Sequence, residues 1–130
     1  MILLDTHVVL WLTSDPAKLS GKAKTAIQDA RTNGDGLAIS DITLLELATL
    51  ASKGRIRLEI SPETLLCELE ARFVILPITG RACARALGLP AAYPKDPADR
   101  IIAATALVEG LSLITADRDI RLSKTLRTIW

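Results

Sequence analysis

The sequence has only one histidine and two cysteines among its 130 residues. These counts exclude a zinc site built from histidine and cysteine clusters. Cys67 and Cys83 show no metal-ligand spacing and no secretory context, so we expect two reduced, partly buried thiols. A Ser-His-Asp triad would have to use His7, which we expect to be a helix or rim residue, and there is no Gly-x-Ser-x-Gly motif.

Charge of one sign and long apolar runs are also scarce. The formal net charge is +1, so any contact with nucleic acid must come from a local site and not from an overall basic field. No apolar stretch approaches the ~20 residues of a membrane span. The first residues, Met-Ile-Leu-Leu-Asp, lack the basic region of a signal peptide. We therefore expect a cytoplasmic protein without a membrane segment.

Short runs of Ile, Leu and Val alternate with longer helical patterns, which is typical of an α/β domain. We expect one domain over residues 1–130, with a central, mainly parallel sheet of four to five strands. The expected strands are residues 2–5, 37–39, 73–76 and 111–115, with a short edge strand at 128–130. The expected helices start at residues 6, 20, 41, 61, 79 and 96.

Acidic residues lie where parallel strands are expected to end, which is where ligands collect in such sheets. Asp5 ends the first strand, Asp117 follows the fourth, and Asp99 opens a helix. Glu46 lies in a helix that is apolar nearly all round, which predicts burial on most sides and a need for a charged, metallic or hydrogen-bonding partner. Carboxylates without histidine or cysteine suit Mg²⁺ or Mn²⁺ better than zinc.

Each of these acids also has a structural interpretation. Asp96-Pro97-Ala98-Asp99 has an N-cap aspartate and proline at the first helical position, so Asp99 could simply complete a capping arrangement. Asp5 could be a structural residue at a strand end. Glu46 could pair with an arginine in the core.

The acids near the C-terminus have a similar alternative. Asp117 and Asp119 could be solvated turn residues that pair with Arg118 or Arg121. The apolar pattern around residues 44–50 and the C-terminal Ile-Trp pair fit either the core or an interface, and periodicity does not separate the two.

Four segments together resemble the PIN-domain VapC family. They are Leu-Leu-Asp-Thr-His at 3–7, Ile-Thr-Leu-Leu-Glu-Leu at 42–47, Asp-Pro-Ala-Asp-Arg-Ile-Ile-Ala-Ala-Thr-Ala at 96–106, and Leu-Ile-Thr-Ala-Asp at 113–117. They occur in the family's order across nearly the whole chain. The resemblance implies an α/β/α sandwich, Mg²⁺- or Mn²⁺-dependent endonucleolytic cleavage of RNA, frequent homodimers, and a toxin role inhibited by a cognate VapB antitoxin.

The resemblance also assigns residues. The family's acidic positions, which carry catalysis and bind the metal, fall on Asp5, Glu46, Asp99 and Asp117. Thr6 and Thr115 match hydroxyl positions near the metal, and Asp96 is an extra acid that we expect beside the ligands, as a helix N-cap. Any contact with DNA is expected only through the antitoxin.

Parts of the sequence are compatible with two other functions. Asp5 could be the nucleophile of a phosphotransferase, but such folds usually place a second aspartate at the position that His7 occupies. The chain could also be a binding module whose acids only cap helices, in which case Mg²⁺ and Mn²⁺ would not stabilise it. For a nuclease, Lys95, Arg100 and Arg118 could contact phosphate, although solvated surface positions explain them equally well.

Overall fold

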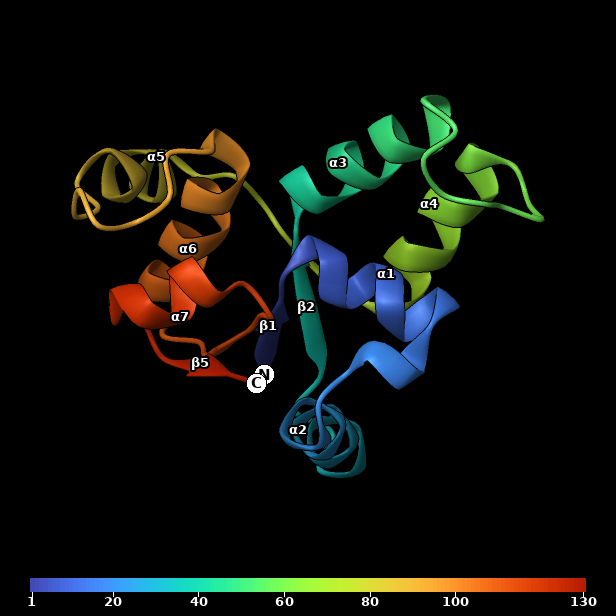
Figure 1. Cartoon of the computed structure of the whole chain (residues 1–130), viewed down its shortest axis with the longest axis horizontal. Helices are drawn as coiled ribbons and strands as arrows, with labels where there is room; N and C mark the ends of the chain where they lie inside the picture. Colours follow the sequence, from blue (N-terminus) through green and yellow to red (C-terminus); the bar gives the residue numbers. More distant parts are fainter.

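Five short strands form one sheet in the computed structural model, which describes residues 1–130 (Figure 1). The strands are β1 (Ile2–Leu4), β2 (Leu37–Ser40), β3 (Val74–Leu76), β4 (Leu113–Ile114) and β5 (Thr128–Ile129). Their order is β3-β2-β1-β4-β5, and all neighbours are parallel. The predicted α/β class with a parallel sheet is therefore confirmed, and β5 is the expected edge strand.

The helices begin at side chains that accept hydrogen bonds from the first free backbone amides. The helical elements are α1 (Thr6–Ser14), η1 (Pro16–Lys18), α2 (Gly21–Thr32), α3 (Asp41–Ser52), α4 (Pro62–Arg72), α5 (Gly80–Leu87), α6 (Pro97–Glu109) and α7 (Arg118–Ser123). The capping residues are Asp5, Ser20, Ser40, Ser61, Thr79, Asp96 and Asp117. None of these helices has both the length and the apolarity needed to cross a membrane.

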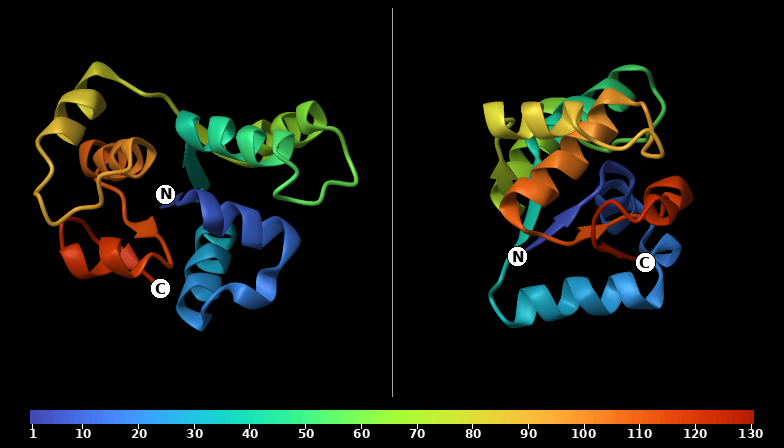
Figure 2. Two further views of the ribbon diagram at one scale, coloured as in Figure 1. Left: turned by 45° about the horizontal axis from the view of Figure 1, so that its top comes forward. Right: turned by 90° about the vertical axis from the view of Figure 1, so that its left-hand side faces the viewer.

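The sheet has a hydrophobic core on each face, because successive strand residues point to opposite sides. Leu4 and Ile114 point toward one core, which α1, α2, α3 and α4 cover. Leu3 and Leu113 point toward the other, which α6 and α7 cover. Figures 1 and 2 show α5, α6 and α7 on one side of β1 and β2, with α1 and α4 on the other. This is the predicted α/β/α sandwich.

Helix α3 is less buried than its sequence predicted. Only Thr43 and Leu47 are buried, and Leu45 is 62% exposed. The helix starts directly after β2 and then packs mainly against α1, α4 and α6. Most of its length therefore extends beyond the sheet. The expectation that it is buried on most sides was wrong.

Two other expectations also differ from the structure. Cys67 and Cys83 are both exposed free thiols, not partly buried ones, because they lie on the outer faces of α4 and α5. Helix α7 was not predicted; it has only six residues, too few to show a helical period.

Candidate active site

The site forms where the strand order changes direction. From β1 the chain passes to β2 and β3 on one side of the sheet, and then to β4 and β5 on the other. In parallel α/β sheets, ligands bind outside the carboxyl ends of strands at such a switch point. Asp5 follows β1 directly, and Thr115, Ala116 and Asp117 follow β4. Segments from opposite ends of the sequence therefore meet at this edge.

Asp5 is a buried and tightly held carboxylate. It is 3% exposed. Its Oδ1 accepts a hydrogen bond from the Thr6 amide at 2.9 Å, which caps α1. Its Oδ2 accepts one from the Thr115 hydroxyl at 2.8 Å. One oxygen is thus fixed by α1 and the other by the segment after β4.

Glu46 reaches the same region from α3. The Thr6 hydroxyl donates to Glu46 Oε1 at 2.5 Å and lies 3.1 Å from the Thr43 hydroxyl. Burial raises the pKa of Glu46, the Thr6 hydrogen bond opposes this, and the negative charge of Asp5 adds to it. Neither ion pair in the structure involves Glu46, so its partner is a hydroxyl network and not an arginine.

Asp99 shows most directly that the acids are gathered together. Its pKa is raised from 3.8 to about 7, first by burial and then by the negative charges of Asp5, Asp96, Glu46 and Asp117. No lysine or arginine pairs with Asp99. The structure therefore brings the other three predicted acids, and Asp96, within electrostatic reach of Asp99.

Capping explains Asp96 but not Asp99. Asp96 Oδ1 accepts hydrogen bonds from the amides of Ala98 and Asp99 at 2.9 and 3.2 Å, and Asp96 is exposed at the start of α6. Asp99 takes part in this cap only through its backbone. Its side chain remains in the acidic cluster.

Asp117 has a structural role as well as a place in the cluster. Its Oδ1 accepts hydrogen bonds from the amides of Asp119 and Ile120, which caps α7. Its own amide donates to the Thr115 hydroxyl at 3.1 Å. Thr115 is fully buried, and the two hydrogen bonds of its hydroxyl link Asp5 to the backbone of Asp117. Asp117 forms no ion pair with Arg118 or Arg121.

Two residues near the acids have roles that the sequence did not indicate. His7 Nε2 accepts a hydrogen bond from the Ala116 amide at 2.9 Å, and its Nδ1 lies 3.7 Å from Asp5 Oδ2. Arg100 donates to the carbonyls of Ala86 and Tyr93, each at 3.3 Å. Arg100 thus holds the loop before α6, which leaves it poorly placed to contact phosphate. The sequence signals for His7 are its position two residues after Asp5 and its place in the segment 3–7 that resembles the family.

The donor set fits a hard divalent cation in its chemistry. The cluster offers carboxylate and hydroxyl oxygens. Burial raises the pKa of Asp99 first, and the surrounding negative charges, which no lysine or arginine pairs with, raise it further. In this conformation no three histidine, cysteine or acidic side chains are arranged closely enough to hold a metal ion. Mg²⁺ is compatible with this arrangement, because it typically uses one or two protein carboxylates and fills its remaining positions with water or phosphate.

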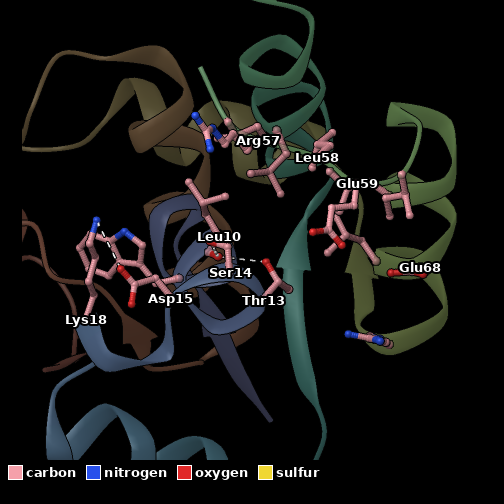
Figure 3. A pocket seen from close by; sticks show the side chains of 16 residues that line it. Leu10, Thr13, Ser14, Asp15, Lys18, Arg57, Leu58, Glu59 and Glu68 are labelled. Atoms are coloured by element: carbon pink, nitrogen blue, oxygen red, sulfur yellow. Dashed lines mark hydrogen bonds and ion pairs between the residues drawn. The ribbon is translucent and has the colours of Figure 1, made fainter. Parts of the chain in front are cut away.

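A separate cavity of about 800 Å³ lies between α1, η1, α4 and the loop before α4 (Figure 3). Its lining includes the apolar Leu10, Leu47 and Leu58, with Arg57 and Glu59 among its charged residues. None of the four acids lines it. The cavity is therefore a surface distinct from the acidic site, although Leu47 stands next to Glu46 in α3.

The model of the PIN domain family matches residues 2–124. The chain belongs to the PIN-domain family. Ribonuclease VapC22 of Mycobacterium tuberculosis (strain ATCC 25618 / H37Rv) is 40% identical over 131 residues, which cover 99% of this chain and 98% of the relative. The resemblance drawn from the four sequence segments is confirmed.

Solved structures show the same PIN fold. VapBC2 from Rickettsia felis, bound to a DNA fragment from its promoter, matches with a TM-score of 0.75 at 19% identity, covering 98% of this chain and 97% of that one. DNA-bound VapBC from Salmonella typhimurium matches with a TM-score of 0.72 at 24% identity and the same coverage. A toxin–antitoxin complex from Klebsiella pneumoniae matches with a TM-score of 0.64 at 28% identity, covering 92% and 89%.

Proposed function

We propose that this PIN-domain protein is the toxin ribonuclease of a toxin–antitoxin pair and cleaves RNA endonucleolytically with Mg²⁺ or Mn²⁺. The observation that carries the proposal is the gathering of four carboxylates at the carboxyl edge of a parallel sheet, with the pKa of Asp99 raised to about 7. The similarity to a relative named as a ribonuclease, over nearly the full length of both chains, supports the same activity.

In this proposal Asp5, Glu46, Asp99 and Asp117 are the catalytic, metal-binding residues. A divalent cation held there would supply Lewis-acid polarisation of the scissile phosphate and stabilise charge on the leaving oxygen. The chain's own part is to hold these carboxylates in place, through Thr115 on Asp5 and Thr6 on Glu46.

The charge of the site explains why a cation is needed. Four carboxylates without basic partners repel the phosphate backbone of RNA, and a cation reverses the sign of that interaction. Asp99 is partly protonated near neutral pH, so cation binding would displace its proton. We expect single-stranded or looped RNA as substrate, because splayed nucleotides can enter a cleft that a duplex cannot.

We further propose that a VapB-like antitoxin inhibits the protein and that any contact with DNA is made through this antitoxin. We also propose that the protein forms a homodimer and is cytoplasmic. The complexes among the structural neighbours support a protein partner for this fold.

The cavity in Figure 3 suits an amphipathic segment of that partner, because apolar side chains line it together with charged ones. Ile60→Asp is a suitable test, since Ile60 lines the cavity and is 39% exposed. It should weaken antitoxin binding without unfolding the toxin.

The decisive experiment measures cleavage of a structured RNA pool in Mg²⁺, Mn²⁺ or EDTA. Asp5→Asn is preferable to Asp5→Ala, because asparagine keeps an oxygen that can accept the Thr6 amide while it removes the charge. Asp99→Asn tests a second ligand, and Asp29→Asn on the exposed face of α2 is the matched control.

We expect metal-dependent cleavage that both site variants lose and the control retains. Absence of cleavage by the wild-type protein with either metal would refute the proposed function. Equal cleavage by folded site variants would also refute it. The chain would then be better described as a binding module whose acids cap helices.

A further inference from the structure

His7 is the only histidine in the chain, and it connects the two segments that meet at the acidic site. Its Nε2 accepts the Ala116 amide across 109 residues of sequence, at 2.9 Å. An atom that accepts a hydrogen bond carries no proton, so the neutral ring holds its proton on Nδ1. Nδ1 lies 3.7 Å from Asp5 Oδ2. The imidazole therefore stands between the segment after β4 and the carboxylate after β1.

The imidazole of His7 also packs against Trp11. The rings of His7 and Trp11 have centroids 5.0 Å apart, and Trp11 in turn lies 5.9 Å from Trp130. Lys18 Nζ lies 5.6 Å from the Trp11 ring centre. Packing against Trp11 limits the movement of the imidazole, whose Nε2 faces the Ala116 amide.

The Ala116 amide, which donates to His7, belongs to the three-residue segment between β4 and α7. Ala116 lies between Thr115, whose hydroxyl donates to Asp5, and Asp117, whose amide donates to Thr115. Without His7, the Ala116 amide would lose its acceptor at the point where the chain turns from β4 into α7. An amide that has lost its partner favours a shifted backbone that can find another one.

We propose that His7 is a positioning residue, which accepts the Ala116 amide and so holds the segment carrying Asp117 at a fixed spacing from Asp5. This inference rests on the proposed metal-dependent function, because the spacing matters only if both carboxylates serve the same cation. In this proposal His7 binds neither the cation nor the RNA. It acts through the backbone of Ala116.

Two substitutions separate hydrogen bonding from packing. His7→Phe keeps an aromatic ring against Trp11 and removes the acceptor, whereas His7→Gln removes the ring and keeps an oxygen that can accept the Ala116 amide. We expect His7→Phe to weaken Mn²⁺ binding by about 10-fold or more, the usual effect of losing a group that orients a metal ligand. His7→Gln should restore most of the affinity. Mn²⁺ binding is measured from the electron paramagnetic resonance signal of the free ion.

A metal-free measurement tests the hydrogen bond itself. The Ala116 amide should exchange slowly with solvent in the wild type and in His7→Gln, and quickly in His7→Phe. Nitrogen NMR of the single imidazole should show an unprotonated Nε2. The positioning role further predicts that His7→Phe has little additional effect on Mn²⁺ affinity in an Asp117→Asn background, because the ligand it positions is already lost.

The outcomes distinguish this inference from the proposed function. If the wild type binds no Mn²⁺ and cuts no RNA, the proposed function fails and the positioning role fails with it. If the wild type binds and cuts but folded His7→Phe matches it in both, only the positioning role is overturned. If folded His7→Gln binds Mn²⁺ weakly while folded His7→Phe binds it as the wild type does, the ring acts by packing, which also overturns it.

Discussion

Replacing Asp99 by asparagine should stabilise the metal-free protein at neutral pH. The pKa of Asp99 is about 7 in the folded chain and near 3.8 in the unfolded chain. Between these values the folded state binds more protons, so its stability falls as pH rises from about 4 to about 7 and then levels off. Asparagine has almost the same shape and no charge, so it escapes this loss while leaving the fold intact.

The size of the effect follows from the pKa difference and the exposure of the group. A gap of about three pKa units corresponds to a ceiling of about 4 kcal/mol. Asp99 is only partly buried, and solvent screening reduces this to about 1–2 kcal/mol. For a domain of this size, that free energy corresponds to an increase in Tm of roughly 3–8 °C at pH 7.5. The two proteins should be nearly equal in stability at pH 4.

The assay is thermal or urea unfolding in EDTA from pH 4 to 8. The quantity compared is the difference in unfolding free energy between wild type and Asp99→Asn, since carboxylates common to both largely cancel. Asp29→Asn, at an exposed position on α2 away from the acids, is the control for the substitution itself. Added Mg²⁺ should stabilise the wild type at pH 7.5 more than the variant. A variant that is less stable than wild type at pH 7.5, or a difference independent of pH, would refute the reasoning.

Three further substitutions have defined outcomes. Thr115→Val removes the hydroxyl that donates to Asp5, and should lower the free energy of unfolding by about 1.5–3 kcal/mol in urea titrations; an unchanged midpoint would show that the hydrogen bond contributes nothing. Glu46→Gln keeps an acceptor for the Thr6 hydroxyl but loses the charge, so metal-dependent RNA cleavage should fall by about 100-fold or more. The circular dichroism spectrum should be unchanged, and retained cleavage would show that Glu46 is not a metal ligand. Gly110→Ala should lower stability by about 1 kcal/mol, because α6 ends there with φ of 68°; a neutral or stabilising effect in the same titration would contradict that interpretation.

Much of the fold was predictable because its signals are local. The starts of α4 and α6 are marked by Ser61-Pro62 and Asp96-Pro97, where a capping side chain precedes a proline. Buried parallel strands appear as short apolar runs, so β1 and β2 are predictable from their composition. Gly110 ends α6 in the left-handed region, as a glycine directly after the helical pattern that ends at Glu109 predicts.

The features that the sequence did not predict depend on tertiary contacts. β4 pairs over only Leu113–Ile114, although the apolar run around it is longer, because strand ends are set by neighbouring strands. The exposure of Leu45 depends on where α3 lies relative to the sheet, which its own sequence does not specify. The acids could be named from the sequence, whereas the link from His7 to Ala116 joins residues 109 apart and has no local pattern.

The hydrogen bond between Thr115 and Asp5 has a consequence for protein synthesis. The two residues lie 110 apart, and β4 and β5 come from the last part of the sequence. A nascent chain that has exposed β1 to α6 contains three of the four acids but lacks the segment that fixes the first of them. A chain interrupted before residue 115 would therefore lack both this hydrogen bond and Asp117, and we expect such a fragment to be inactive.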